Sequence, residues 1–383
     1  MIANPETLSF TLELSRSCNL RCEFCYNPWK IDREAATGEM STADALRLVE
    51  KLVDETGPDE ITLSGGEPFL RRDIFEIVRA VKRRGVKVGI VTNGTLVTRE
   101  VADKCVSEGV DVVQVSLLSD QREVHNRLVG SDSFDRTIEG ILNLQARKGR
   151  VYTFFVGTRR NIASFRGALE LNVLLGVRNV ALGRFVPGGA AIGGWQSLLP
   201  DPDEIQAALD SADHLARRYP IAISISTPIL PCLVDLSKYE TITPGFCTVG
   251  DGAHALFAID PLGNVKVCSH SPVSLGNIFE RTFAEIVRHR FLRDFLDTVP
   301  EFCRDCPVLV VCKAGCRSSA HLCYGSFQHE DPYLVTWKAR ASKTSPAVAR
   351  LAEMAAGAAG PSGAAAGKEK AWRKGRKPAS PKR

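Results

Sequence analysis

Cysteines constrain the fold of this chain more than any other residue type. The sequence has twelve cysteines in 383 residues. Cys18, Cys22 and Cys25 share one short segment, and eight more lie between Cys232 and Cys323. The first residues, MIANPETLSF, lack the basic patch, apolar stretch and cleavage site of a secretory signal, so we expect a cytoplasmic protein. In a reducing compartment, clustered cysteines indicate metal binding or catalysis rather than disulfides.

Composition and charge exclude two classes of partner. No uninterrupted apolar run approaches the roughly 18 residues of a membrane span. The net charge is +5, but residues 368–383 carry eight Lys or Arg and one Glu, so the remainder has a charge of +5 − 7 = −2. We therefore expect no membrane span and no nucleic-acid partner. Beyond about residue 355 the chain is of low complexity and then basic, which predicts a disordered, solvated tail.

Short β-branched runs alternate with amphipathic segments from residue 8 to about 225. Repeated strand–helix units of this kind predict parallel strands joined by right-handed crossovers. Six units fall short of the eight in a closed barrel, so we predict a partial (β/α)6 barrel of the TIM type. The expected strands cover 8–14, 60–63, 87–92, 110–117, 151–157 and 177–185. The expected helices follow Ser41, span 71–84, follow Thr98, span 134–148 and 164–175, and run from Asp201–Pro202 to about 218.

The three cysteines at 18, 22 and 25 directly follow the first predicted strand. Three thiolates in one loop can hold three irons of a four-iron cluster and leave the fourth iron open as a reaction site. A structural zinc takes four ligands, so zinc with a borrowed fourth ligand is the alternative.

This segment, with Phe24 before the third cysteine, resembles the signature of the radical S-adenosylmethionine (SAM) superfamily. The resemblance extends over residues 8–225. It implies an enzyme whose open iron chelates SAM and whose reduced cluster cleaves SAM to methionine and a 5′-deoxyadenosyl radical, with flavodoxin or ferredoxin as a typical electron donor. In SGGEP (64–68), Gly65, Gly66, Glu67 and Pro68 match the glycine-rich SAM motif, with Glu67 expected to face the SAM ammonium. Asn93 and Ser116 are further SAM-contact candidates, although they are equally compatible with ordinary loop polar residues.

The later cysteines follow a second pattern. Cys247 precedes Gly263 and Cys268, and Cys303-x2-Cys306-x5-Cys312-x3-Cys316 and Cys323 follow. This resembles the seven-cysteine SPASM extension and implies two auxiliary four-iron clusters, three clusters in all. By that resemblance Cys303, Cys306, Cys312 and Cys323 ligate the outer cluster, and Cys247, Cys268 and Cys316 the inner one. A zinc ribbon is the alternative, but it leaves Cys247, Cys268 and Cys323 unused.

The inner cluster lacks an assured fourth ligand. Cys232, in TPILPCLVD, is one candidate, and an iron open to substrate or water is the other; we favour the open site because Cys232 lies outside the spacing pattern. Cys105 is expected to be a buried core thiol. Arg184, His125, His270, Asp235, Tyr239 and Asp260 are weaker candidates, and nothing in the sequence chooses a catalytic base among them.

The sequence divides into three parts: a barrel over 1–225, a SPASM domain over 226–335, loop-rich and folded around metal centres rather than an apolar core, and a C-terminal helix and tail over 336–383. The resemblance implies oxidative modification of a ribosomally made peptide, with a crosslink or an oxidised side chain as product. The alternative substrate is a tetrapyrrole or another cofactor precursor. Because the chain starts at its first barrel strand, a peptide would need a separate recognition protein or bind the auxiliary domain. An alternative of another class is a non-catalytic metal-binding adaptor.

Overall fold

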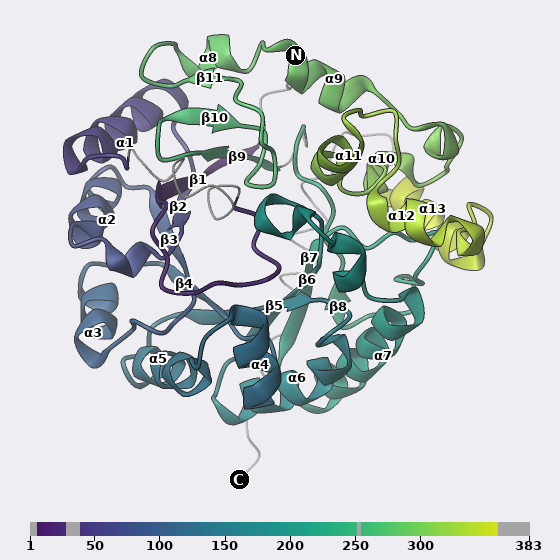
Figure 1. The fold of residues 1–383 in the computed structure, drawn as a ribbon, viewed down its shortest axis with the longest axis horizontal. Coiled ribbons are helices and arrows are strands. Elements are labelled where there is room, and N and C mark those ends of the chain that lie inside the picture. Colours follow the sequence, from purple (N-terminus) through teal and green to yellow (C-terminus); the bar gives the residue numbers. More distant parts are fainter. Residues whose placement is uncertain (1–5, 28–38, 251–253, 359–383) are drawn as a thin grey trace.

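A curved parallel sheet dominates the computed structural model, which describes residues 6–27, 39–250 and 254–358 (Figure 1). Seven strands follow one another in chain order and pair in parallel with their neighbours. They are β1 (Thr7–Ser15), β2 (Glu60–Gly65), β3 (Lys87–Thr92), β4 (Val112–Ser116), β5 (Val151–Gly157), β6 (Asn179–Arg184) and β7 (Ala222–Thr227). The predicted partial barrel is confirmed, and β7 adds a seventh parallel strand to the six expected.

Helices cover the outer face of this sheet (Figure 1). They are α1 (Thr42–Thr56), α2 (Ile74–Arg83), α3 (Arg99–Ser107), α4 (Arg122–Val129), α5 (Phe134–Ala146), α6 (Phe165–Leu174) and α7 (Pro202–Arg218). Ser41 and Thr98 cap α1 and α3 as predicted, and Asp201 forms a capping box at α7.

Two elements differ from the prediction. The helix expected from residue 71 begins at Ile74, because Arg71 is extended and its guanidinium donates to the carbonyls of Leu14 and Met40. Helix α4 was not predicted; its sequence, REVHNRLV, is mostly polar and has few apolar positions to reveal a helical face.

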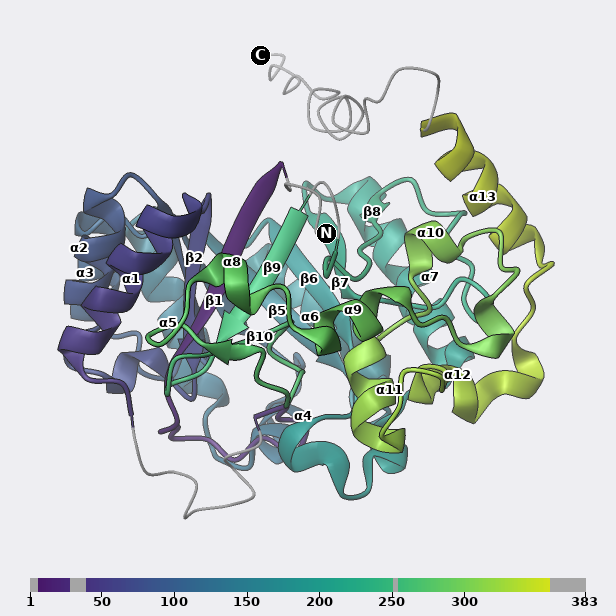
Figure 2. The same cartoon turned by 90° about the horizontal axis from the view of Figure 1, so that it is seen from above.

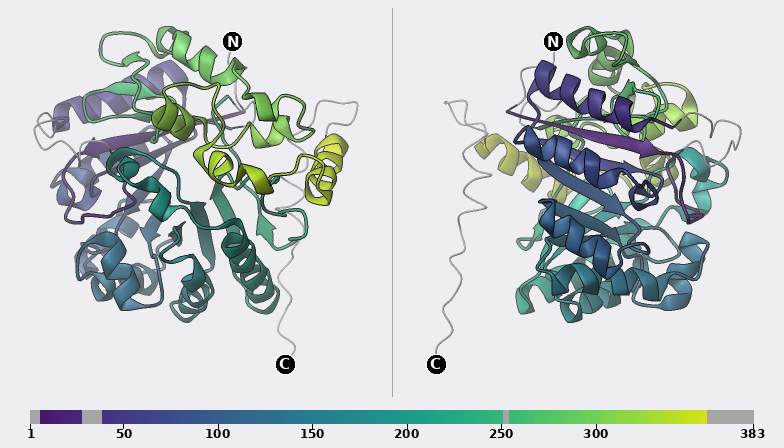
Figure 3. Two further views of the ribbon diagram at one scale, coloured as in Figure 1. Left: turned by 45° about the vertical axis from the view of Figure 1, so that its right-hand side comes forward. Right: turned by 90° about the vertical axis from the view of Figure 1, so that its left-hand side faces the viewer.

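The C-terminal third extends the sheet at both edges. β8 (Ile242–Thr243) pairs with β7, β9 (His254–Ile259) pairs in parallel with β1, and β10 (Asn264–Lys266) and β11 (Gly276–Asn277) continue outward. Six short helices follow: α8 (Phe283–Ile286), α9 (Arg290–Asp297), α10 (Leu309–Cys312), α11 (Arg317–Tyr324), α12 (Pro332–Trp337) and α13 (Pro346–Ala358). Figure 3 shows these green to yellow elements gathered on one side of the barrel.

The C-terminal third shares its apolar core with the barrel. Phe257, Val265 and Ile278 pack in one cluster with β1 and α1, and Tyr333 and Leu334 pack in another with β5, β6 and α7. The expectation of a region folded around metal centres in place of an apolar core is therefore wrong. The apolar residues of this third, spread among loops, cover the exposed edges of the barrel sheet.

Among the described residues, no helix combines the length and apolar character needed to cross a bilayer. The predicted low-complexity tail lies outside the described residues from 359 onward.

Candidate active site and metal centres

The first cysteine loop leaves β1 and is held against α4. The backbone amides of Arg21 and Glu23 donate to the carbonyls of Val129 and Leu128, at 2.9 and 3.0 Å. Gly130 ends α4 in a left-handed conformation, and a Cβ there would lie 2.9 Å from the Arg21 carbonyl oxygen. The helix that sequence analysis missed is therefore the support on which Cys18, Cys22 and Cys25 rest. Figure 2 shows α4 and α11 at the same end of the barrel.

The two glycines after β2 pack directly on the backbone that leads into this loop. The Gly66 amide donates to the Ser15 carbonyl at 2.6 Å, and a Cβ on Gly66 would lie 2.0 Å from the Ser17 carbonyl oxygen. Gly65 has a φ of +127°, a region that favours glycine. The Gly65 carbonyl accepts a hydrogen bond from the side-chain amide of Asn27 at 2.8 Å. The motif thus clamps the cysteine loop on both sides, at Ser15–Ser17 and at Asn27.

Glu67 is fully buried and links the ends of β2 and β3. Its Oε1 accepts from the Thr92 hydroxyl at 2.7 Å and the Phe69 amide at 3.2 Å, and its Oε2 accepts from the Asn93 amide at 2.9 Å. Burial raises the pKa of this carboxyl, opposed by these hydrogen bonds. Every contact named here is to the protein, and contact with the SAM ammonium stays a prediction.

The other predicted SAM contacts lie at the same ends of the strands. The side-chain amide of Asn93 donates to the side-chain oxygen of Asn19 at 2.9 Å, which places Asn93 beside the cysteine loop. Pro68 is buried at the start of a 3₁₀ turn, Phe24 is partly buried against the barrel core, and Ser116 ends β4.

A second cysteine-bearing loop touches the first. The Tyr26 ring, next to Cys25, lies 4.8 Å from the His270 ring, two residues after Cys268. Lys266 on β10 donates to Glu13 on β1 at 2.7 Å, and both side chains are almost fully buried. Burial, together with Lys266 and Arg184, lowers the pKa of His270 to about 4. Sequence analysis missed the Glu13–Lys266 ion pair, whose members lie 253 residues apart.

Cys247, Cys268 and Cys316 form one group. Burial and the nearby Cys268 thiol raise the pKa of Cys247 to about 11, and burial, Asp331 and Cys268 raise the pKa of Cys316 to about 12. The Cys268 and Cys316 sulfurs lie 3.2 and 3.4 Å from the hydroxyls of Ser318 and Ser319. These three are the cysteines predicted to hold the inner cluster.

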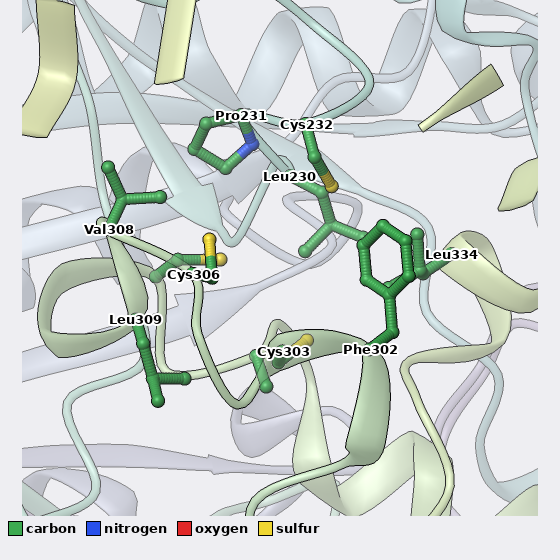
Figure 4. Close-up of a pocket in the computed structure, with 11 residues that line it drawn as sticks. Leu230, Pro231, Cys232, Phe302, Cys303, Cys306, Val308, Leu309 and Leu334 are labelled. Carbon is green, nitrogen blue, oxygen red and sulfur yellow. The ribbon is translucent and has the colours of Figure 1, made fainter. Parts of the chain in front are cut away.

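Cys303, Cys306 and Cys312 form another group around a small apolar cavity (Figure 4). Cys232 lines the same cavity, whereas Cys323, on α11, does not. None of the twelve cysteines forms a disulfide.

A left-handed turn separates the two groups. Lys313, Ala314 and Gly315 have φ values of 51°, 59° and 79°, between Cys312 at the end of α10 and Cys316 before α11. Side chains at two of these positions make the turn strained. The turn lets two cysteines only four residues apart serve different groups.

The donor sets fit iron–sulfur clusters. Within the described ranges, no three His, Cys, Asp or Glu side chains converge as ligands of a single metal ion would. Cluster ligands bind different irons, so their sulfurs surround a larger volume. Three thiols in one loop and a set of thiols that line one small cavity are ligands of the kind that such clusters use.

The weaker candidates have structural partners. Arg184 is fully buried and bonds to Asp331 at 2.7 Å, which leaves it no contact with solvent. His125 and Cys105 are buried, and Tyr239 donates to Asp210. Asp235 pairs with Arg350, and Asp260 caps the turn between β9 and β10.

A partial barrel with a three-cysteine loop after its first strand and grouped cysteines beyond its last defines a class of enzyme. The chain belongs to the radical SAM superfamily, whose sequence model matches residues 12–171, and carries a SPASM iron–sulfur cluster-binding domain, matched over residues 247–307. The resemblance drawn from the sequence is confirmed, and the alternative of a non-catalytic metal-binding adaptor is excluded.

Two relatives show how far the similarity reaches. An AdoMet-dependent heme synthase of Methanosarcina barkeri is 31% identical over 356 residues, covering 84% of this chain and 95% of the relative. A probable GTP 3′,8-cyclase of Saccharolobus islandicus is 35% identical over 180 residues, covering 46% of this chain and 57% of the relative.

Solved structures share the fold at low identity. SuiB of Streptococcus suis bound to its precursor peptide SuiA gives a TM-score of 0.67 at 16% identity, covering 85% of this chain and 75% of SuiB. The enzyme anSMEcpe with bound AdoMet gives 0.69 at 19% identity, covering 91% and 95%. The chain is therefore an enzyme of a class that uses SAM and iron–sulfur clusters.

Proposed function

We propose that this enzyme carries three four-iron clusters and oxidises an organic substrate by a radical route. Cys18, Cys22 and Cys25 would hold the cluster that passes one electron from an external donor to SAM, for cleavage to methionine and a 5′-deoxyadenosyl radical. Net oxidation of the substrate would then remove a hydrogen atom, one electron and one proton, with the electron passing to the auxiliary clusters and the proton to water. The predicted boundary at 225/226 lies inside β7 and the one at 335/336 lies inside α12, so we place the ends of the first two functional parts after Thr227 and after Trp337.

The contact between the two cysteine-bearing loops carries this proposal. Tyr26 beside Cys25 stacks near His270 beside Cys268, and the Glu13–Lys266 pair fixes the strands that bear these loops. A substrate bound between them would be close to both the site of hydrogen abstraction and an electron acceptor. This arrangement supports net oxidation.

The glycine motif and Asn93 would position SAM beside the open iron. Glu67 accepts a hydrogen bond from the backbone amide of Asn93, so it would position Asn93 in the SAM site even without contacting SAM.

Glu67→Gln should weaken SAM binding without lowering the iron content. The substitution removes the negative charge that is predicted to face the SAM ammonium, so one charge-assisted hydrogen bond to SAM would be lost. Such a loss costs about 1.5–3 kcal/mol, or about ten-fold to more than a hundred-fold in affinity. Isothermal titration of the reconstituted protein with SAM measures it, with exposed Glu100→Gln as the control. A dissociation constant unchanged by Glu67→Gln would remove Glu67 from the SAM site.

The substrate class has two candidates. A tetrapyrrole is favoured by the heme synthase relative, which matches over 95% of its own length. A peptide, the first choice from the sequence, is compatible with the fold, because SuiB with the same fold was solved with its precursor peptide. We further propose that a peptide would bind either a separate recognition protein or the auxiliary domain directly, and that flavodoxin or ferredoxin would supply the electron for either substrate.

Anaerobic incubation with SAM, reductant and each candidate substrate distinguishes them. For the true substrate class, 5′-deoxyadenosine should rise above the substrate-free level, and deuterium placed at the reacting carbon should appear in it. If neither tetrapyrrole precursors nor peptides raise 5′-deoxyadenosine, both substrate proposals are wrong.

A further inference from the structure

We propose that Cys232, rather than Cys323, is the fourth ligand of the outer cluster, with Cys303, Cys306 and Cys312. The proposal rests on the SPASM domain binding iron–sulfur clusters and is independent of the substrate. It differs from the ligand set that the family resemblance implies, and from the inner-cluster role considered for Cys232.

Four thiols surround one cavity. Cys232, Cys303, Cys306 and Cys312 line it, and its other walls are the side chains or backbone of Leu230, Pro231, Phe302, Val308, Leu309, Ala314 and Leu334. In Figure 4 the sulfurs of Cys232, Cys303 and Cys306 point toward the space between them. Apart from the thiols, the lining side chains are apolar, as suits a group that needs four sulfur ligands and no water.

The backbone fixes Cys232 at this place. The turn that carries it is closed by hydrogen bonds from the Leu233 and Val234 amides to the Leu230 carbonyl, each at 3.0 Å. The Cys232 carbonyl accepts from the Ser342 amide at 2.9 Å. Cys232 is thus held from two sides, by its own turn and by the segment before α13.

Cys323 lies in a different environment. It stands in the last turn of α11, seven residues after Cys316, which is about 10 Å along a helix axis. It is not among the residues that line the cavity shared by Cys232, Cys303, Cys306 and Cys312. Its distance from Cys316 along α11 also separates it from the inner group.

Ligation by Cys232 would join the barrel to the auxiliary domain. Cys232 follows the end of β7 at Thr227 by five residues, whereas the other three ligands come from residues 303–312. Iron bonds between these segments would tie the last barrel strand to α10. Loading of this cluster should therefore stabilise the docking of the domain on the barrel.

The parent protein for the test is the full-length chain with Cys18, Cys22 and Cys25 all replaced by alanine, so that only auxiliary clusters remain. The test compares Cys232→Ala with Cys323→Ala in this parent. The parent should hold about eight irons per chain. We expect Cys232→Ala to lower this toward four and to change one of the two reduced-state electron paramagnetic resonance signals. Cys323→Ala and the buried-thiol control Cys105→Ala should keep both iron and spectrum.

Cys232→Ser distinguishes loss of an iron ligand from loss of the fold, because the serine hydroxyl is nearly isosteric with the thiol and can still bind iron weakly. We expect this variant to keep its circular dichroism while shifting one resonance signal. Iron content and spectrum equal to the parent's in both Cys232 variants, or loss of the outer signal in Cys323→Ala, would overturn the proposal. A parent protein with no iron would overturn the auxiliary clusters themselves, so the two failures can be told apart.

Discussion

Replacing Cys18, Cys22 and Cys25 together with alanine should abolish SAM cleavage and remove about a third of the bound iron. One four-iron cluster of three would be lost, leaving about eight irons of twelve. The loop is held by backbone hydrogen bonds to Leu128 and Val129, so its fold does not depend on the thiols. Iron assay and chromatographic detection of 5′-deoxyadenosine measure both effects.

Cys105→Ala is the control for this variant, because it removes a buried thiol of α3 that belongs to neither cysteine group. It should keep full iron and full SAM cleavage. SAM cleavage that survives in the triple variant would show that the active-site cluster has been assigned to the wrong cysteines.

Asp331→Asn should destabilise the protein by about 3–5 kcal/mol, the usual cost of breaking a buried ion pair. Arg184 and Asp331 are both fully buried and 2.7 Å apart. Removing the negative charge leaves the guanidinium uncompensated beneath the auxiliary domain. Chemical denaturation followed by fluorescence measures the change.

Asp331 also connects this ion pair to a cluster ligand. Its Oδ2 accepts from the Cys316 amide at 2.7 Å, and its Oδ1 accepts from the Tyr333 amide at the start of α12. We therefore expect Asp331→Asn to lower the auxiliary iron content as well. Asp203→Asn, at an exposed pair with Arg340, should change neither quantity. Wild-type stability in Asp331→Asn would show that the ion pair contributes little.

Local patterns sufficed for most of the barrel. Strands β3 and β5 match their predicted ranges, because buried parallel strands are runs of β-branched and apolar residues bounded by turns. Helix starts at Ser41, Thr98 and Asp201 were readable because capping depends on neighbouring residues.

The alternation of isoleucine and serine in β7 is a local strand pattern that sequence analysis missed, and its pairing with β6 places it in the sheet. Features that depend on distant contacts, in contrast, were not predictable. The ion-pair partner of Arg184, Asp331, lies 147 residues away along the chain, and no local pattern reveals it. Cys232 lies outside the cysteine spacing, and only the folded chain brings it to Cys303, Cys306 and Cys312.

The most direct test of the whole account is SAM cleavage by the anaerobically reconstituted wild-type protein under strong reductant. The account predicts 5′-deoxyadenosine and methionine in equal amounts, dependent on iron and sulfide. Protein loaded with about twelve irons that forms no 5′-deoxyadenosine would contradict it.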